Sequence, residues 1–340
     1  MNGKIAEGLN FLSKQTPSRL VNMARVYSSF QAAKSFQKIN HQGMPISISI
    51  EPTTSCNLRC PECPSGLRSF TRPTGLMKRE LFESVIDQLA PTLSYLIFYF
   101  QGEPYLNPHL LEMVRYASRK KIYTATSTNA HYLMDETAKK TVESGLDRLI
   151  ISIDGTSQET YQSYRIGGRL DKVIEGAENI LRWKEKLKSK TPHVIFQFLV
   201  VRQNEHQIEE VTALAKKIGV DEVKLKTAQI YDFENGSDLI PLNEKYSRYH
   251  KNQNGKYSIK NGLSDECWKM WHSCVITWDG KVVPCCFDKD AHFVLGDLNN
   301  TTFKEIWGGE KYNQFRESLF TSRSEIEMCR NCTEGAKVFV

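Results

Sequence analysis

Long apolar runs are absent from this 340-residue sequence. A membrane-spanning helix needs about 18 apolar residues in succession, and no stretch of the chain approaches that length. The N-terminus also lacks an apolar core followed by a small-residue cleavage site, so the sequence predicts no secretory signal. Basic tracts with interleaved aromatic residues do not occur, and a formal net charge of +6 gives no reason to expect nucleic acid as a partner. With 40% hydrophobic and 25% charged residues, the composition is that of an ordinary globular protein.

The sequence does contain nine cysteines, and they cluster in two places. Without export signals, this number predicts a reducing, cytoplasmic environment, where clustered thiols are ligands more often than disulfides. The first cluster is Cys56-x3-Cys60-x2-Cys63, in a loop that follows the apolar stretch 45–50. Three thiolates from one short loop can hold three irons of a [4Fe–4S] cube and leave the fourth iron open. A zinc knuckle or inert buried thiols are the alternatives, although zinc usually takes a fourth protein ligand.

Strand-like and helix-like segments alternate six times between residues 45 and 229. Most of the strand-like segments are apolar on both faces, as in a parallel sheet covered by helices, and we predict strands at 46–50, 95–100, 122–126, 148–153, 193–201 and 222–227. The predicted helices between them span 78–89, 108–120, 135–144, 171–187 and 205–218. The alternation predicts an α/β fold with right-handed crossovers. Six units are too few to close an eight-stranded barrel, so we expect an open, curved (β/α)6 sheet.

The first 44 residues are typical of an amphipathic helical arm. Apolar residues recur there at helical spacing, with basic residues among them; the apolar positions are Leu20, Met23, Tyr27 and Phe30. We expect this arm to pack on the main domain, and contact with a membrane surface or a partner is the alternative. Residues 230–262 are polar, and we predict a linker or substrate-side segment there with a short helix near 243–250.

The run CNLRCPEC, which holds the first three cysteines, resembles the signature of the radical S-adenosylmethionine (radical SAM) superfamily. This resemblance implies a partial, TIM-like (β/α)6 barrel in which S-adenosylmethionine (SAM) binds the open iron through its amino and carboxylate groups. It also implies that a flavodoxin- or ferredoxin-type partner reduces the cluster. The reduced cluster of such enzymes cleaves SAM to methionine and a 5′-deoxyadenosyl radical, which abstracts hydrogen from a substrate C–H bond.

Further elements of the same family fall at the ends of predicted strands, where parallel α/β folds bind their ligands. The run 101–104 resembles the family's GGEP element, with Gln101 in place of the first glycine, and 127–130 resembles its STNG element, with Ala130 in place of the last. Carried over from the family, the residues expected to bind the cofactor are Gly102, Glu103, Pro104, Ser127, Asn129, Ser152, Gln197 and Asn204.

Two charged residues are candidate catalytic groups. Asp154 closes the fourth predicted strand, where the family often places contacts to the ribose or the substrate. Arg165 lies in a Y-x3-R-x-G-G stretch that is common in this branch of the family, and its guanidinium could clamp a carboxylate or phosphate, or act on a substrate hydroxyl. The alternatives are an Asp-Gly turn residue for Asp154 and a surface ion pair for Arg165.

The second group of cysteines lies in the last quarter of the chain and consists of Cys267, Cys274, Cys285, Cys286, Cys329 and Cys332. Residues 278–285 are typical of a hairpin with an Asp-Gly turn, and the hairpin delivers Cys285 to a strand end. Together with Cys267 and the pair Cys329-x2-Cys332, this thiolate would complete a fully protein-ligated [4Fe–4S] cluster. A structural four-cysteine zinc site is the alternative, and Cys274 could replace Cys267.

This last quarter resembles the SPASM/twitch extension of radical SAM enzymes, in the cysteine pattern and in the stretches 296–298 and 303–307. Because the chain ends eight residues after Cys332, we expect one auxiliary cluster rather than two, with Cys286 structural. The predicted domains are a helical extension at 1–44, the radical SAM partial barrel at 45–229, a linker or substrate-side segment at 230–262, and a small SPASM/twitch-like domain at 263–340.

Three functions are compatible with these features. The first is an oxidoreductase that removes two electrons from a small hydroxylated molecule, such as a sugar or aminocyclitol, with the auxiliary cluster accepting an electron. The second is a maturase that modifies a peptide or protein. The third, from another class, is a non-catalytic zinc or iron–sulfur protein that senses redox state.

Overall fold

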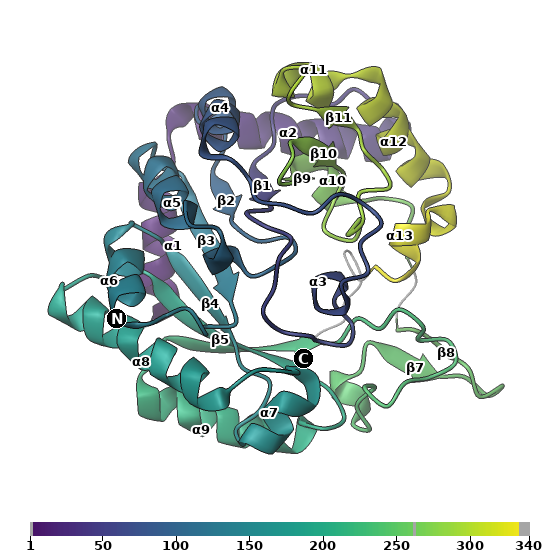
Figure 1. Ribbon diagram of the computed structural model, residues 1–340. Coiled ribbons are helices and arrows are strands. Elements are labelled where there is room, and N and C mark those ends of the chain that lie inside the picture. Colours follow the sequence, from purple (N-terminus) through teal and green to yellow (C-terminus); the bar gives the residue numbers. More distant parts are fainter. Residues whose placement is uncertain (1–2, 261–262, 333–340) are drawn as a thin grey trace. The chain divides into compact units, whose positions relative to one another are not determined.

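The computed structural model of the chain describes residues 3–260 and 263–332 (Figure 1). The first and last residues of the predicted domains, 1–2 and 333–340, therefore lie outside the described residues, as do 261–262 of the predicted linker. The chain forms two compact units. One contains the described parts of 1–55, 70–126 and 263–335, and the other those of 56–69 and 127–262. Among the described residues, no helix combines the length and the apolar character needed to cross a bilayer.

The first unit contains six strands in the order β11-β10-β9-β1-β2-β3, of which β1, β2 and β3 pair in parallel. The strands are β1 (Ser47–Ile50), β2 (Tyr95–Ile97), β3 (Tyr123–Thr128), β9 (Ser273–Ile276), β10 (Lys281–Val283) and β11 (Gly296–Asp297). The helices are α1 (Gly3–Ser13), α2 (Pro17–Phe36), α4 (Arg79–Leu89), η1 (Pro104–Leu106), α5 (Leu110–Arg119), α10 (Trp268–His272), α11 (Phe303–Gly308), α12 (Glu310–Thr321), η4 (Arg323–Glu325) and α13 (Glu327–Arg330).

The C-terminal hairpin extends the sheet of this unit. β9 and β10 are antiparallel and are joined by the predicted turn at Gly280, whose φ of 87° suits glycine. β9 also pairs in parallel with β1, with Ser47 opposite Ser273 and Ile50 opposite Ile276. The last quarter of the chain therefore covers the edge of the first strand, a connection that the sequence pattern did not predict.

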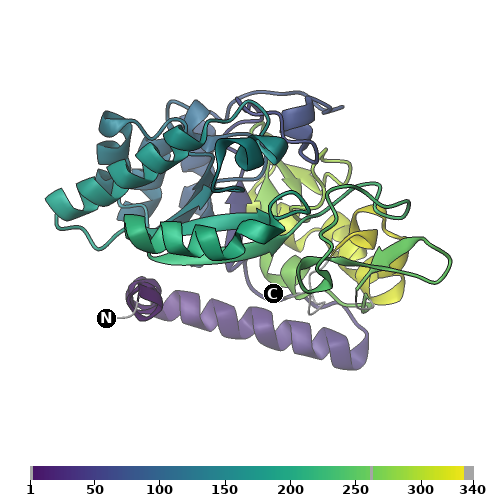
Figure 2. The same ribbon diagram turned by 90° about the horizontal axis from the view of Figure 1, so that it is seen from below.

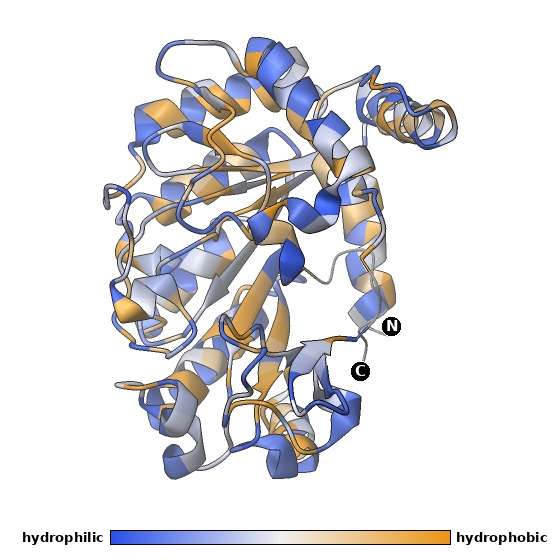
Figure 3. Ribbon diagram, turned by 90° about the vertical axis from the view of Figure 1, so that its right-hand side faces the viewer, coloured by the Kyte–Doolittle hydropathy of each residue, from blue (hydrophilic) through white to orange (hydrophobic). Residues whose placement is uncertain are grey.

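The second unit contains the parallel strands β4 (Arg148–Ser152), β5 (His193–Val200) and β6 (Glu222–Thr227), and a separate antiparallel pair, β7 (Tyr249–Lys251) and β8 (Tyr257–Ile259). Its helices are α3 (Pro64–Leu67), α6 (Asp135–Glu143), α7 (Gln158–Tyr164), α8 (Leu170–Lys186), η2 (Glu205–Gln207), α9 (Ile208–Ile218) and η3 (Glu244–Tyr246). The helices of the protein alternate between hydrophobic and hydrophilic colouring along their length, as helices with one face on a core do (Figure 3).

The predicted alternation of strands and helices is confirmed, with most boundaries displaced by one to three residues. The predicted short helix near 243–250 is confirmed only as the 3-10 helix η3, and from Tyr249 onward the stretch belongs to strand β7. Tyr249 explains the difference, because its buried ring packs in a core and its hydroxyl bonds to both the N–H and the C=O of Ile230, at 2.9 and 3.2 Å. This anchoring favours an extended backbone over a helix.

The N-terminal arm packs within the first unit (Figure 2). Phe11 of α1 contacts Tyr95 of β2 and Tyr123 of β3, which confirms contact with the predicted main domain. Val26, Phe30 and Ala33 of α2 form a buried cluster with Trp271, whose indole N–H donates to Ser29 at 3.0 Å. The predicted face of the helix is wrong in part, however, since Leu20 and Tyr27 are 54% and 56% exposed.

Polar residues occupy much of the buried face of α2 instead. The most heavily bonded is Arg19, which is 2% exposed. Its guanidinium donates to the carbonyl oxygens of Lys14, Ala90, Lys120 and Lys121, so one side chain ties the start of α2 to the ends of α4 and α5. The burial of this cation is therefore compensated by four acceptors.

Replacing Arg19 by Ala removes the buried guanidinium that bonds these four carbonyl oxygens, and we expect the free energy of unfolding to fall by about 3 kcal/mol. Urea titration of the iron-loaded protein under anoxic conditions, followed by circular dichroism, measures this change. The matched control is Arg25→Ala, because Arg25 is exposed on the same helix and should change the free energy by no more than about 0.5 kcal/mol. Equal midpoints for the two variants would contradict the assigned role of Arg19.

Candidate functional site

The first cysteine group lies in a loop of the second unit that ends in the short helix α3. Cys60 is buried, and Cys56 and Cys63 are half-buried. Cys63 is the N-cap residue of α3, and the loop is closed by Gly66, where a Cβ atom would lie 2.7 Å from both the N and the O of Cys60. Glycine at this position allows the helix to press directly against the cysteine backbone.

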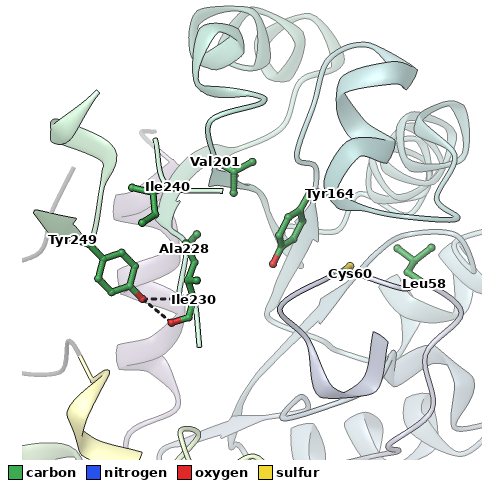
Figure 4. Packing of buried hydrophobic residues seen from close by; sticks show 8 residues of the cluster. All are labelled: Leu58, Cys60, Tyr164, Val201, Ala228, Ile230, Ile240 and Tyr249. Carbon is green, nitrogen blue, oxygen red and sulfur yellow. Dashed lines mark hydrogen bonds between the residues drawn. The ribbon is translucent and has the colours of Figure 1, made fainter. Parts of the chain in front are cut away.

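A hydrophobic core backs the loop (Figure 4). Leu58, Cys60 and Tyr164 belong to one buried cluster, and Cys56 and Cys63 pack against it. Burial raises the pKa of the Tyr164 hydroxyl, so this ring stays neutral beside the thiols. All three cysteines are therefore in contact with this apolar core.

Asp154 and Arg165 meet at the same loop. The Nε of Arg165 donates to Oδ2 of Asp154 at 2.5 Å, and its Nη1 lies 3.8 Å from Sγ of Cys60. Asp154 is fully buried, and its other oxygen accepts the backbone N–H of Leu199 at 2.7 Å. Burial raises the pKa of the Cys60 thiol, and the neighbouring guanidinium opposes this rise. The structure therefore brings both predicted catalytic residues to the cysteine loop.

The predicted residues from 127 onward, at the end of β3, belong to the second unit together with those of β4, and they lie close to that loop or at a strand end. Asn129 donates from Nδ2 to Oδ1 of Asn57, between two of the cysteines, at 2.8 Å. Ala130 has a φ of 66°, which explains why the family motif has glycine there. Ser152 is the last residue of β4 and is buried, and Ser127 is half-buried.

Gln197 and Asn204 belong to β5 and to the turn after it. Gln197 pairs with Ser152 across the parallel ladder and is half-buried. Asn204 is fully buried, and its Nδ2 donates to the carbonyl oxygens of Asp154 and Leu199 at 3.0 and 2.8 Å. Because both amide hydrogens serve the backbone, this geometry favours a positioning role for Asn204 over the predicted contact with the cofactor.

The GGEP-like element belongs to the first unit and is bonded to the segment after β1. Gly102 has a φ of 74°, and a Cβ atom there would lie 2.3 Å from the carbonyl oxygen of Thr53. The backbone N–H of Glu103 donates to the carbonyl oxygen of Ser55 at 2.8 Å, and Pro104 begins η1. Glu103 is 2% exposed, so a carboxylate is held at the carboxyl end of β2, where a cation can use it.

The second cysteine group forms a pocket within the first unit. A space of about 330 Å³, its mouth included, is lined by four of the nine cysteines: Cys267, Cys285, Cys329 and Cys332. These are the four predicted ligands of the auxiliary cluster. Burial raises the pKa of the Cys285 thiol, and the neighbouring thiols of Cys286, Cys267 and Cys332 add to this rise, so several sulfurs share one site.

The remaining two cysteines of this group do not line that pocket. Cys274 is fully buried in β9, and its pKa is raised by burial, whereas Cys286 is half-buried beside Cys285. The geometry therefore favours Cys267 over Cys274 as the first ligand.

The donors of both cysteine groups fit an iron–sulfur cube. Thiolates are its usual protein ligands, and a set of four completes its coordination. The second group supplies such a set around one pocket, from Cys267, Cys285, Cys329 and Cys332.

Sequence reasoning missed two arginines, the buried Arg323 and the half-buried Arg72. Arg323 lines the second pocket, and its Nη2 lies 3.6 Å from Sγ of Cys332. Arg72 forms a two-point ion pair with the fully buried Glu51, at 2.6 and 2.8 Å, directly after β1. A carboxylate directly after a buried strand was a usable signal for Glu51, but no sequence feature marks its partner.

Two family models match parts of the chain. Residues 50–215 match the model of the radical SAM superfamily, and residues 267–333 match SPASM, an iron–sulfur cluster-binding domain. Both matched ranges fall inside predicted domains, whose boundaries stay predictions.

Several characterised proteins are similar along most of their length. A tungsten-containing aldehyde ferredoxin oxidoreductase cofactor-modifying protein of Pyrococcus furiosus is 27% identical over 84% of this chain and 86% of its own. An AdoMet-dependent heme synthase of Methanosarcina barkeri is 25% identical over 80% and 85%. A PqqA peptide cyclase of Gluconobacter oxydans is 25% identical over 85% and 82%.

Solved structures share the fold. Streptococcus suis SuiB bound to its precursor peptide SuiA matches with a TM-score of 0.64 at 16% identity, over 92% of this chain and 77% of that one. BtrN in complex with AdoMet and 2-DOIA matches with a TM-score of 0.52 at 16% identity, over 86% and 94%. These likenesses confirm the predicted α/β fold with a partial barrel. The C-terminal cluster-binding domain is confirmed by the SPASM match.

The choice of ligands can be tested by iron content. We expect the reconstituted protein to hold about eight irons, and Cys267→Ala to hold about four, because losing one of four thiolates releases the second cube. Cys274→Ala is the matched control and should keep about eight. Iron and sulfide assays after anoxic reconstitution measure both. The triple replacement of Cys56, Cys60 and Cys63 by Ala should also leave about four. Loss of the second cube from Cys274→Ala alone would reverse the assignment.

Proposed function

Since the chain belongs to the radical SAM superfamily and carries a C-terminal SPASM domain, we propose that it oxidises a small hydroxylated molecule, such as a sugar or aminocyclitol, by two electrons. The cofactors of an enzyme of this kind are a [4Fe–4S] cluster, SAM and an auxiliary iron–sulfur cluster. Their combined chemistry is the one-electron cleavage of the C–S bond of SAM and the abstraction of a hydrogen atom from the substrate. We place the enzyme in the cytoplasm, where a flavodoxin or ferredoxin supplies the electron.

Residues of the chain hold these groups in defined ways. Cys56, Cys60 and Cys63 would hold the first cluster, and the apolar core against which they pack would limit the access of water to it. Gly102 and Glu103 would receive the ammonium group of SAM, because the glycine permits close backbone approach and the buried carboxylate is an acceptor. Ser127, Asn129, Ser152 and Gln197 are the proposed contacts to the rest of the cofactor.

The second cysteine pocket supports the oxidative outcome, and this single observation carries the proposal. Four cysteines line it, so a cluster held there would be fully ligated by the protein, would leave no iron open to substrate and would supply electron transfer. Removal of one hydrogen atom from the carbon of an alcohol, followed by loss of one electron to such a cluster and one proton to solvent, would give the carbonyl and account for both electrons.

Substrate size is the finer question. The described N-terminal residues form two helices, and α2 packs on the core of the first unit, so they give no sign of a separate peptide-binding module. BtrN, with its small ligand 2-DOIA, provides a precedent for a small substrate on this fold. The similarity to a PqqA peptide cyclase favours the second candidate function, which is the maturation of a peptide. A non-catalytic redox sensor is the third candidate, and it would form no 5′-deoxyadenosine.

Label transfer distinguishes these candidates. With SAM, dithionite and a deuterated sugar or aminocyclitol, we expect 5′-deoxyadenosine to gain deuterium, because the radical takes its hydrogen from the substrate C–H bond. Mass spectrometry of the nucleoside measures the transfer, and the triple variant lacking Cys56, Cys60 and Cys63 is the control without cleavage. Label from a deuterated peptide alone would favour the maturase. No 5′-deoxyadenosine above background would refute enzymatic activity.

Loss of the auxiliary cluster should separate the cleavage of SAM from the oxidation of the substrate. In Cys329→Ala/Cys332→Ala we expect SAM cleavage to persist at a reduced rate and oxidised product to disappear, because the substrate radical has no acceptor. Chromatographic assays of 5′-deoxyadenosine and of carbonyl product measure both. The control is Cys286→Ala, whose thiol does not line the pocket. Unimpaired product formation by the double variant would exclude the acceptor role.

A further inference from the structure

Asp154 and Arg165 form a buried ion pair that touches a ligand of the first cluster rather than facing open solvent. The Asp154 side chain is fully buried and that of Arg165 is 17% exposed. One N–H group of Arg165 points to the carboxylate and another to Sγ of Cys60. The guanidinium therefore bridges a negative charge and a cluster thiolate.

The position of this bridge is fixed from several sides. Asp154 lies at the end of β4 and is held by the backbone N–H of Leu199, while Asn204 donates to its carbonyl oxygen. Arg165 directly follows α7. Its backbone N–H donates to the carbonyl oxygen of Tyr161 at 2.9 Å, and its own carbonyl oxygen accepts the backbone N–H of Gly168 at 2.8 Å. An arginine anchored in this way is pre-organised to donate to one sulfur.

The charges of the pair cancel next to the cube. Reduction adds an electron to a cluster, so a lone buried cation beside it raises the reduction potential and a lone buried anion lowers it. Arg165 alone would raise the potential, which weakens the driving force for cleaving SAM. Asp154 offsets this charge while the hydrogen bond to the sulfur remains. The other arginines of the cysteine loop, Arg59 and Arg68, are exposed, and solvent screens their charge.

We propose that Asp154 and Arg165 are positioning residues rather than groups that act on the substrate: Arg165 holds Cys60, and Asp154 cancels the charge of Arg165 so that it does not raise the reduction potential of the first cluster. This inference rests on the proposed function, because a low potential matters only where SAM is cleaved. The contact of Arg323 with Cys332 is a similar arrangement at the second pocket. Donation from a buried arginine to one ligand sulfur thus occurs at both cysteine sets.

Redox titration of the holoenzyme, followed by electron paramagnetic resonance without substrate, tests the proposal. The signal of the first cluster is identified by its change when SAM is added. Asp154→Asn removes the negative charge and keeps the shape, so we expect the equilibrium constant for reduction to rise at least tenfold, about 59 mV for one electron. Arg165→Gln should lower it by a similar factor, and the double variant should return to within about threefold of the wild type because the net charge is restored.

A surface pair provides the matched control. Arg169 and Asp171 are bonded at 2.5 Å but are 65% and 60% exposed, so Arg169→Gln and Asp171→Asn should leave the potential unchanged. If the Arg165→Gln protein does not retain its iron, the reduction potential measured for Asp154→Asn alone tests the proposal.

An unchanged potential in an iron-replete Asp154→Asn protein overturns the proposal, as does an altered KM for substrate as its only effect. Shifted potentials without any oxidised substrate would support the inference and refute the proposed function. Normal substrate oxidation with unshifted potentials would refute the inference and support the proposed function.

Discussion

Parallel strand pairing is the constraint on which both units depend, because it turns the carboxyl ends of neighbouring strands toward the same edge of a sheet. In the first unit this brings the segment after β1 against the turn after β2, where Gly102 lies so close to the carbonyl oxygen of Thr53 that no Cβ atom would fit. In the second unit it brings the end of β4 beside β5, where the Asp154 carboxylate accepts a backbone N–H. The chemistry-bearing residues therefore follow from strand topology more than from their distance along the chain.

In different parts of the protein, the guanidinium group of an arginine that is largely removed from water is compensated by several hydrogen-bond acceptors. Arg19 donates to four carbonyl oxygens and stabilises the packing of α2, whereas Arg165 donates to a carboxylate and a thiol at the cysteine loop. In each case a cation removed from water is compensated by several acceptors in fixed directions, which the planar guanidinium fork allows and an ammonium group would not. Replacement by lysine would keep the charge and lose the geometry.

Much of the fold and the candidate site was predictable, because apolar strands, helix periodicity and cysteine spacing are local features. The failures arise where distant contacts outweigh local pattern. The buried face of α2 contains Arg19, Asn22 and Ser29, which no hydrophobic pattern would assign to a core, because their partners lie elsewhere in the chain. Sequence also left the choice between Cys267 and Cys274 open. The structure favours Cys267, because the pairing of β9 with β1 buries Cys274 in the sheet, and Cys274 does not line the pocket.

The pairing of β1 with β9 has a consequence for how the protein is made. Ser47 and Ser273 face each other in the ladder, although 226 residues separate them (273 − 47). During synthesis, one side of β1 therefore stays uncovered until nearly the whole polypeptide has left the ribosome, and an open apolar strand invites association with other chains. Closing so long a loop is also slow compared with forming the neighbouring helices. We expect the nascent chain to depend on chaperones until its last quarter emerges, and truncated forms lacking that quarter to aggregate.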